Sequence, residues 1–436
     1  MASVLLSTPS AAPRAAVART RGPIFAAAPL QHAKLVPRQA WQRQTSTTTS
    51  SCSSRTRHFA TDSTKIYRSG KNNIFFNFAA ETSLCNQPLK NVLFQWRNET
   101  VVTIGRHQNP WTECRLAELE KDGVELVRRV SGGGAVLQDL GCLTFSLIAN
   151  TADYQNTADS PATNALAAFT EKNFKLVIKA LERSGIPDCA RSGRNDIVYK
   201  NEFKISGSAF KTMNNSAQVP KLLHHGTLLF DTDFTSLGRY LTPAKQKLQA
   251  KGIQSVKSRV INLKEINPAL TLEELMANFE AVFLEEYNHS PTEPETLTPD
   301  SSMLAADPVF ADVQKRMSDW DFRFGQTPQF SHTMGPHRLH KSEDADAVWG
   351  MFECHLEVDN GVIQDGVVFS DCLLPDAVTK VNAILKNCKT QTGKINYVAE
   401  ELKKALVEEG NNAGYVGDEK KLVSDFADWV GTQMKE

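Results

Sequence analysis

The segment RRVSGGGAVLQDLG, at residues 128–141, combines residue types that suit the binding of an anion. Its three consecutive glycines follow two arginines, and each glycine inside a regular element costs roughly 0.5–1 kcal/mol relative to alanine. A plain turn between two strands is one interpretation. In the other, bare backbone N–H groups form an anion-binding concavity, and an arginine adds a bidentate donor for phosphate.

The stretch VELVRRV, which leads into these glycines, reads as a strand. Successive side chains on a strand point to opposite faces, so Arg128 and Arg129 are expected on different sides. Only one of them can reach the glycine loop, and the other is expected at the surface. The loop matches neither the G-x-x-x-x-G-K-[ST] pattern of a P-loop nor the G-x-G-x-x-G pattern of a dinucleotide-binding turn.

A second candidate site lies in SGRNDIVYKNEFKISGSAF, where residues 203–209 read as a strand. Alternation predicts that Lys204, Ser206 and Ser208 share one face, opposite Phe203, Ile205, Gly207 and Ala209. Two small serines beside one lysine leave room for a substrate next to the ammonium group. A solvated lysine on an edge strand would give the same pattern.

Several polar residues near these motifs have a plainer explanation. Asn195 and Asp196 stand at the entry of a hairpin and are turn residues by default. His224 and His225, in HHGT, are expected to form a hydrogen-bonding pair at a strand end, because no third metal ligand is close in sequence. The eight cysteines show neither a C-x-x-C pair nor zinc spacing, so no metal site is expected and most read as small apolar residues in a reduced compartment.

Composition excludes several classes of function. The chain has 436 residues, which favours two or three domains. Its 49 basic and 49 acidic residues balance, so no electrostatic case exists for binding nucleic acid or an anionic membrane. A spanning helix needs about 18 uninterrupted apolar residues, and the best stretch, AVLQDLGCLTFSLIAN, is interrupted and too short. No membrane span is expected.

Residues 1–61 contain no Asp or Glu, although they hold several arginines and a Ser/Thr run. This composition is typical of an organelle transit peptide, with the mitochondrion favoured over the plastid. A disordered tail with a chance bias is the alternative. The segment is therefore expected to be disordered and to direct import into the mitochondrial matrix.

The remaining elements predict an α+β fold, because strand-like runs mix with helical patterns without a regular βαβ rhythm. Residues 65–290 are expected to form a large mixed-sheet domain. The Pro-, Ser- and Thr-rich stretch at 290–302 reads as a linker or an exposed excursion, at the start of a connector over 291–335. Residues 336–436 alternate as strands and then become helical, which predicts a small α+β domain.

The order RRVSGGGAVLQDLG, GRNDIVYKNEFKISGSAF and HHGTLLF resembles the lipoate–protein ligase A family, which shares its fold with the biotin–protein ligases. The likeness spans about residues 65–436 and includes the flanking segments TIGRHQNPWTEC and DWDFRFGQTPQFSH. It implies a catalytic domain of the biotin/lipoate ligase type followed by an accessory domain. With the leader, it indicates a eukaryotic mitochondrial form. One departure is Gln138, at a position near which the family often has His or another polar residue.

The resemblance implies an ATP-dependent ligase that also uses Mg²⁺. Lipoate would be activated to lipoyl-AMP with release of diphosphate, and the lipoyl group would then pass to a lysine amine. The implied catalytic residue is Lys204, which would touch the lipoate carboxylate and the α-phosphate. The implied nucleotide-binding residues are Arg129, Gly134, Ala135, Val136, Leu137 and Lys204. The implied lipoate-binding residues are Lys204, Gly133 and His225, with Asn195 and Asp196 in support.

The implied partners are lipoyl-carrier domains, namely the E2 subunits of 2-oxoacid dehydrogenases and the glycine cleavage H protein, and the protein is expected to be a monomer. Within the same family, a lipoyltransferase would use a preformed lipoyl-nucleotide or move lipoyl groups between carriers. Octanoyl transfer would need a catalytic cysteine, for which Cys142 and Cys189 lack the sequence context. A non-catalytic carrier-binding protein is disfavoured because Arg129, the glycines and Lys204 occur together.

Overall fold

The computed structural model describes residues 64–155, 164–214, 220–241, 248–250, 259–386, 394–409 and 414–435. The leader predicted over residues 1–61 lies outside these described residues. Among the described helices, none is long and apolar enough to cross a bilayer.

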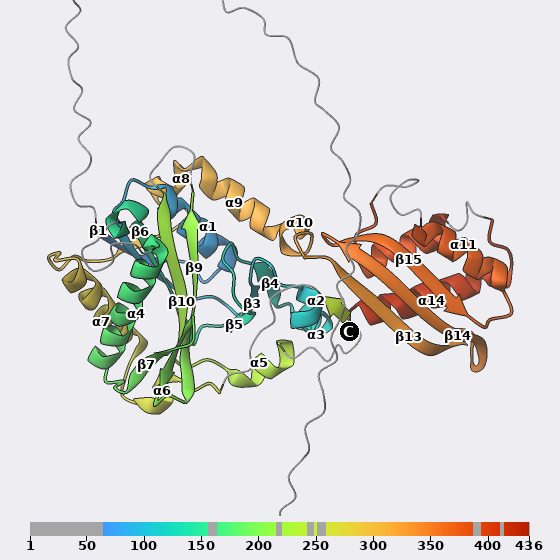
Figure 1. Cartoon of the computed structure of the whole chain (residues 1–436), viewed down its shortest axis with the longest axis horizontal. Helices are drawn as coiled ribbons and strands as arrows, with labels where there is room; N and C mark the ends of the chain where they lie inside the picture. Colours follow the sequence, from blue (N-terminus) through green and yellow to red (C-terminus); the bar gives the residue numbers. More distant parts are fainter. Residues whose placement is uncertain are drawn as a thin grey trace, which may run out of the picture. The chain divides into compact units, whose positions relative to one another are not determined.

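The largest element is an eight-stranded mixed sheet with the order β12-β1-β2-β6-β10-β9-β8-β7 (Figure 1). β1 pairs in parallel with β12 and β2, and the other neighbours are antiparallel. Its strands are β1 (Thr64–Ser69), β2 (Asn91–Trp96), β6 (Cys142–Asn150), β7 (Cys189–Ser192), β8 (Asp196–Tyr199), β9 (Phe203–Met213), β10 (Lys221–Leu229) and β12 (Glu295–Leu297). With the helices around it, this sheet confirms the α+β class.

Helices cover both faces of the large sheet (Figure 1). On one face lie α4 (Ala165–Arg183) and α7 (Leu272–Glu286), whose apolar stripes pack on β6 and β10 in one core cluster. On the other lie α1 (Ile74–Asn86) and α9 (Pro308–Ser318), which share a second cluster with β2. The start of α4 is capped by the Asn164 side chain, which satisfies one N–H that the helix leaves unpaired.

A separate three-stranded sheet has the order β4-β3-β5. Its strands are β3 (Val101–Ile104), β4 (Glu125–Arg128) and β5 (Val136–Gln138). Val102, Ile104 and Leu137 pack together with Leu119 of α3 (Leu116–Asp122) in a small core. On the opposite face, Val101 and Val127 pack in the cluster that α1 and α9 share with β2, whereas Thr103, Val136 and Gln138 line a cavity.

The segment expected as an exposed linker belongs to the fold of the first domain. Residues 295–297 form β12, which extends the large sheet by parallel pairing with β1. Leu297 is buried, and the Phe310 ring of α9 packs edge-on against Phe76 of α1. Most of residues 290–302 are exposed, as predicted, but the pairing of β12 with β1 makes the segment part of the large sheet and not a free linker.

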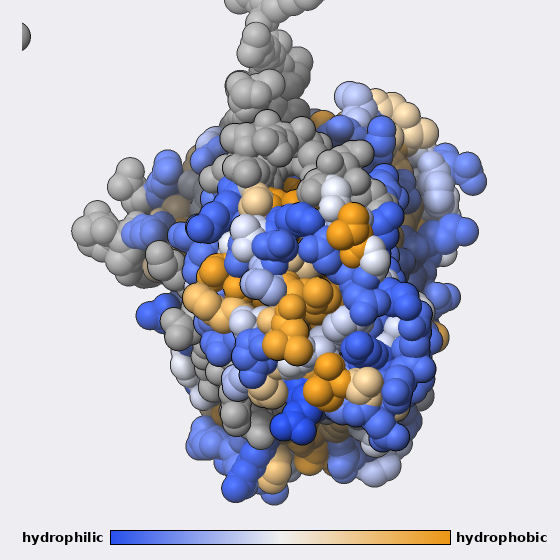
Figure 2. Space-filling model, turned by 90° about the vertical axis from the view of Figure 1, so that its right-hand side faces the viewer, coloured by the Kyte–Doolittle hydropathy of each residue, from blue (hydrophilic) through white to orange (hydrophobic). Residues whose placement is uncertain are grey.

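The C-terminal region contains a four-stranded sheet with the order β11-β13-β14-β15, covered by helices. Its elements are β11 (Leu248–Ala250), β13 (Phe330–Lys341), β14 (Asp344–Asp359), β15 (Val362–Ser370), α11 (Pro375–Lys386), α12 (Ala399–Lys404), η2 (Ala405–Glu409) and α14 (Asp418–Lys435). Large apolar side chains gather on the face of the molecule seen in Figure 2. In the C-terminal region, the exposed large apolar residues on β14, β15 and the loop after β15 are Val348, Met351, Phe369 and Leu373.

The C-terminal core includes elements from outside residues 336–436. β11, at 248–250, is an edge strand of its sheet. Trp111, in α2 (Pro110–Glu113), packs against Phe330 and edge-on against Tyr397. The described residues therefore form one compact unit.

The remaining short elements are η1 (Thr151–Tyr154), α5 (Phe234–Tyr240), α6 (Leu263–Ile266), α8 (Ser302–Ala305) and α10 (Trp320–Arg323).

Candidate active site

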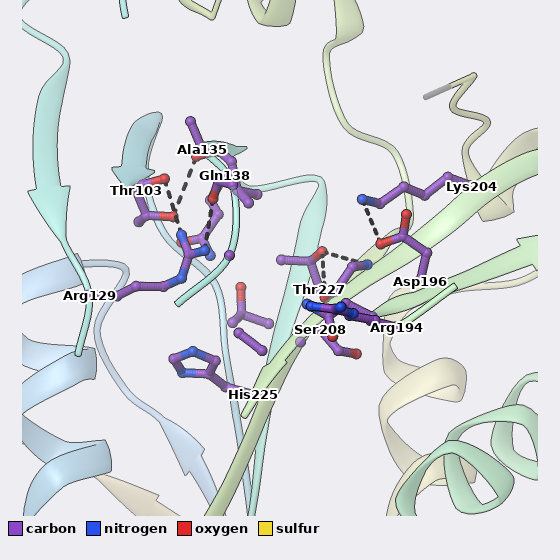
Figure 3. Close-up of a pocket in the computed structure, with 18 of the residues that line it drawn as sticks. Thr103, Arg129, Ala135, Gln138, Arg194, Asp196, Lys204, Ser208, His225 and Thr227 are labelled. Atoms are coloured by element: carbon purple, nitrogen blue, oxygen red, sulfur yellow. Dashed lines mark hydrogen bonds and ion pairs between the residues drawn. The ribbon is translucent and has the colours of Figure 1, made fainter. Parts of the chain in front are cut away.

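A cavity of about 520 Å³ lies between the three-stranded sheet and the α1 face of the large sheet (Figure 3). One wall consists of the glycine loop and β5, residues 133–136 and Gln138. The other wall consists of residues 192–196, 207–209 and 225–227, together with Lys204. Both sequence motifs therefore meet across one space.

The glycine loop is built around the buried side chain of Arg129. Its guanidinium donates to the carbonyl oxygens of Gly132 (2.7 Å), Gly134 (2.8 Å) and Thr103 (3.4 Å), and to the Ser131 hydroxyl (3.2 Å). Burial lowers the pKa of Arg129 to about 10, so it remains protonated at neutral pH. Arg129 thus stabilises the conformation of the loop through hydrogen bonds to its backbone. Direct contact of Arg129 with a nucleotide remains a prediction.

Two glycine positions require the absence of a side chain. Gly133 has φ +99°, and a Cβ there would lie 2.7 Å from Arg129 Nη2. A Cβ on Gly105 would lie 2.2 Å from the carbonyl oxygen of Gly133. Among the described residues, the N–H groups of Gly132, Gly133 and Gly134 have no acceptor. The loop therefore presents free N–H groups, as an anion-binding concavity requires.

Arg128 is buried, which contradicts the expectation that the second arginine lies at the surface. Its guanidinium donates to the carbonyl oxygens of residues 105, 106 and 108 and, on its other side, to those of residues 322 and 323. A further bond of 2.9 Å reaches the hydroxyl of Thr327. Strand alternation does place the two arginines on opposite faces, but here both faces are covered. Arg128 thereby links the strand before the glycine loop to the segment that leads into β13.

Lys204 points into the cavity, where its Nζ forms an ion pair of 2.8 Å with Asp196 Oδ1 (Figure 3). It lies on the same face as Gly207, since a Cβ on Gly207 would meet Lys204 Nζ at 3.2 Å. The predicted grouping with Ser206 is therefore wrong.

The cause of this change is a β-bulge in β9. Ile197 pairs with Ser206 and Val198 with Lys204, so Ile205 is an extra residue in the ladder. The Lys204 N–H instead donates to the carbonyl oxygen of Arg259 at 2.7 Å. An extra residue reverses the alternation of side chains. Ile205 and Ser206 are consequently both buried, and Lys204 faces the cavity.

His225 lies in a buried chain of polar groups beside the cavity. Its Nδ1 is 2.9 Å from Glu81 Oε1, and its Nε2 is 2.6 Å from the Ser131 hydroxyl. Glu81 also accepts a hydrogen bond from the hydroxyl of Ser146. The α1 helix is therefore connected to the glycine loop through the imidazole of His225.

His224 lies on the opposite face of β10, stacked on the ring of Phe210 at 4.3 Å between centroids. Its ring nitrogens have no partner among the described residues, and burial lowers the pKa of His224 well below its usual value. The expected hydrogen-bonding pair of His224 and His225 is thus wrong, because alternation separates the two rings. The described residues contain no cluster of metal-ligating side chains.

Most of the predicted binding residues line the cavity. Gly133, Gly134, Ala135 and Val136 form the loop wall, while Lys204, His225, Asn195 and Asp196 lie on the other wall. Asn195 also accepts a hydrogen bond from the Ser208 N–H at 2.7 Å through its carbonyl oxygen. Leu137 is the exception, because its side chain is buried in the core of the three-stranded sheet.

The sequence reasoning missed Glu81, Ser131, Gly105 and Gln138 as parts of this site. Ser131 and Gln138 flank the glycine run, so closeness in sequence was a usable signal for both. Glu81 sits in a helix of low amphipathicity, where a single acid among buried residues was the only sign. The closeness of Gly105 to the loop depends on strand pairing and had no local signal.

Comparison with known proteins agrees with this geometry. The lipoyl protein ligase A/B catalytic domain family matches residues 73–284, and the bacterial lipoate protein ligase C-terminus family matches residues 337–413. A lipoate-protein ligase A of Psychrobacter cryohalolentis is 38% identical over 347 residues, which cover 78% of this chain and 93% of the relative.

Among solved structures, Plasmodium falciparum LipL1 in complex with lipoate is similar with a TM-score of 0.50 and 28% identity. The match covers 85% of this chain and 99% of that one. The two matched families follow the order of the large sheet and the C-terminal sheet along the chain. From its sequence relatives and its fold, this chain belongs to the lipoate-protein ligase A family.

Proposed function

We propose that this ligase activates lipoate with ATP and then transfers the lipoyl group to a carrier lysine within the same cavity. The observation that carries the proposal is the meeting of the free N–H groups of the glycine loop with Lys204 across one space of about 520 Å³. Fixed donors stabilise negative charge best when they are already oriented. Both steps develop such charge on oxygen atoms.

In the first step, a carboxylate oxygen of lipoate attacks the α-phosphorus of ATP, and the bond to diphosphate breaks. Lys204 Nζ would exchange Asp196 for the two approaching anions and offset their repulsion. The loop N–H groups, including those of Gly133 and Gly134, would donate to phosphate oxygens. In the second step, the amine of the carrier lysine attacks the acyl carbon. AMP then leaves and the nitrogen loses a proton.

Magnesium would enter with ATP. The ion prefers oxygen ligands and is usually held by one or two carboxylates plus substrate phosphates. Among the described residues that line the cavity, Asp196 supplies a carboxylate. It fits this role when Lys204 turns to the substrate, and the ion would then neutralise phosphate charge.

The acceptors that we propose are the lipoyl domains of E2 subunits and the glycine cleavage H protein. We also propose that the enzyme acts as a monomer in the mitochondrial matrix, directed there by the acid-free residues 1–61. A reporter fused to residues 1–65 should enter mitochondria, and a cytosolic reporter would contradict this location.

The second candidate function is transfer from a preformed lipoyl-nucleotide, which the same cavity would accommodate. Transfer through a cysteine thioester is disfavoured. Burial raises the pKa of Cys142 and that of Cys189 to about 12, and the thiolate is the nucleophilic form.

Lipoate-dependent exchange of diphosphate into ATP tests the proposal directly. A ligase should catalyse this exchange without any carrier protein. A protein that shows no exchange, yet transfers the lipoyl group from supplied lipoyl-AMP to a carrier domain, would be a lipoyltransferase. Failure in both assays would overturn the enzymatic proposal.

A further inference from the structure

Three buried carboxamide side chains, those of Asn77, Asn98 and Gln138, are joined in a row by hydrogen bonds. Gln138 is the last of them and lines the cavity. Asn77 Nδ2 donates to Asn98 Oδ1 at 2.8 Å, and Asn98 Nδ2 donates to Gln138 Oε1 at 2.8 Å. Asn77 and Asn98 are at most 1% exposed. Gln138 is 5% exposed and lines the cavity, so it connects the other two amides to the site.

The contacts of Asn77 determine which amide donates and which accepts in each of these hydrogen bonds. Its Nδ2 has two hydrogens and is also within hydrogen-bond distance of the carbonyl oxygens of Arg97 (3.0 Å) and Lys71 (3.2 Å), so one hydrogen is shared between two acceptors. Its Oδ1 accepts from the Ser69 hydroxyl (2.5 Å). A backbone carbonyl only accepts hydrogen bonds. Rotation of the Asn77 amide by half a turn would therefore place its oxygen against two other oxygens.

The fixed direction then passes along the chain. Since each carboxamide has one accepting oxygen and one donating nitrogen, Asn98 must accept from Asn77 and donate to Gln138. The oxygen of Gln138 is consequently occupied, and its Nε2 is left to face the cavity. Among the described residues this nitrogen has no hydrogen-bond acceptor.

We propose that Gln138 donates this N–H to an acceptor atom of the bound nucleotide, and that Asn77 and Asn98 keep the donor oriented. The nucleotide is favoured over the acyl group because Gln138 continues the strand that follows the glycine loop. Its side chain shares the cavity face of that sheet with Val136 and Thr103. The inference rests on the proposed function, because it assigns one contact within the same site.

Two substitutions that hardly change size test the direction of the chain. Gln138→Glu keeps the acceptor for Asn98 but presents oxygen to the ligand. Asn98→Asp keeps the acceptor for Asn77 but cannot donate to Gln138, so the Gln138 amide should turn over and present its oxygen instead. Asn98 is a positioning residue, outside the set that lines the cavity.

We expect both variants to raise the KM for ATP in diphosphate exchange by about 10- to 100-fold, as expected for an unpaired buried polar group. The KM for lipoate should stay within about twofold. Both defects should shrink at acidic pH, because a protonated carboxyl donates a hydrogen bond as the amide does. A purely structural defect would not recover in this way. Asn382→Asp is the control, because this amide in α11 accepts one hydrogen bond and donates one, as Asn98 does, although both of its bonds are to the backbone of Val368.

An unchanged KM for ATP in folded Gln138→Glu would overturn the contact, and an unchanged one in folded Asn98→Asp would overturn the role of the chain. A rise confined to the KM for lipoate would assign the acceptor to the acyl group and contradict the choice made here. Should Asn98→Asp fail to fold by circular dichroism, Gln138→Glu still decides whether the contact exists.

Binding of ATP and of lipoyl-AMP, measured by calorimetry, separates this inference from the proposed function. A wild-type protein that shows no exchange but binds lipoyl-AMP would contradict ATP activation alone. In that case the Gln138→Glu variant should bind lipoyl-AMP more weakly than wild type, and equal binding would overturn the inference.

Discussion

The two walls of the cavity hold their cations in different ways. On the glycine-loop wall, Arg129 is buried and makes several hydrogen bonds to the loop itself, while Arg128 is buried behind it. On the other wall, the Lys204 side chain is 27% exposed and pairs with a single carboxylate, that of Asp196. A cation whose three nitrogens all bond the protein shapes a site, whereas a cation with one exchangeable partner is available to a ligand. We therefore expect the arginines to position the loop and Lys204 to take part in the chemistry.

The largest effect should be a loss of stability when Arg128, behind the glycine loop, is replaced. Arg128→Ala removes a guanidinium that bonds five carbonyl oxygens and the Thr327 hydroxyl. Buried acceptors left without donors cost about 1–3 kcal/mol each when water cannot replace the donor. We expect the free energy of unfolding to fall by at least about 3 kcal/mol, measured by urea denaturation.

The control for this loss is Arg239→Ala, which removes an exposed arginine from two surface ion pairs, with Glu118 and Asp122. It should change stability by no more than about 1 kcal/mol. A fully stable Arg128→Ala protein would show that water replaces the guanidinium and that this wall is less rigid than described.

Substitution of the exchangeable cation should affect catalysis without unfolding the protein. Lys204→Ala should lower diphosphate exchange by roughly 100-fold or more, the scale seen when one preorganised donor is removed. Lys204→Arg should restore little, because a planar fork does not replace a compact ammonium. Lys211→Ala, an exposed lysine on the same strand, should retain normal exchange. Near-normal exchange by Lys204→Ala would place the site elsewhere.

A smaller effect should come from a change in loop shape alone. Gly133→Ala puts a Cβ at φ +99° and 2.7 Å from Arg129 Nη2, so the loop or the guanidinium that bonds it must shift. We expect the KM for ATP to rise about tenfold, since such a backbone conformation costs of order 1–3 kcal/mol for other residues. Gly132→Ala is the matched control, because a Cβ there meets nothing within 4 Å. Equal effects of the two would argue against the importance of loop shape.

The smallest effect concerns the partner of Lys204. Asp196→Asn frees the ammonium from its ion pair, which should tighten the binding of lipoate alone by up to about fivefold, because half-exposed pairs contribute at most about 1 kcal/mol. Calorimetry without ATP and Mg²⁺ isolates this effect from any role of Asp196 with the metal ion. Weaker binding would mean that Asp196 orients Lys204 instead of competing for it.

Much of the site was predictable because its residues cluster in short motifs. The glycine run with its arginines and the lysine strand indicated an anion-binding site, and the order of the motifs indicated the family. The two family matches, over residues 73–284 and 337–413, follow one another along the chain in the order that the resemblance implied. Local patterns such as these follow from the two- and 3.6-residue periods of strands and helices.

The sequence by itself determined which residue types are present for chemistry and in which order they occur along the chain. Only the tertiary structure decided which way they point. The bulge at Ile205 turns Lys204 to the cavity, and the pairing of β11 and β12 joins segments far apart in the chain. Packing on both faces buries Arg128, and the contact with Asn98 orients Gln138. These outcomes depend on hydrogen-bond partners distant in sequence, and no local period encodes a partner that only the folded chain brings near.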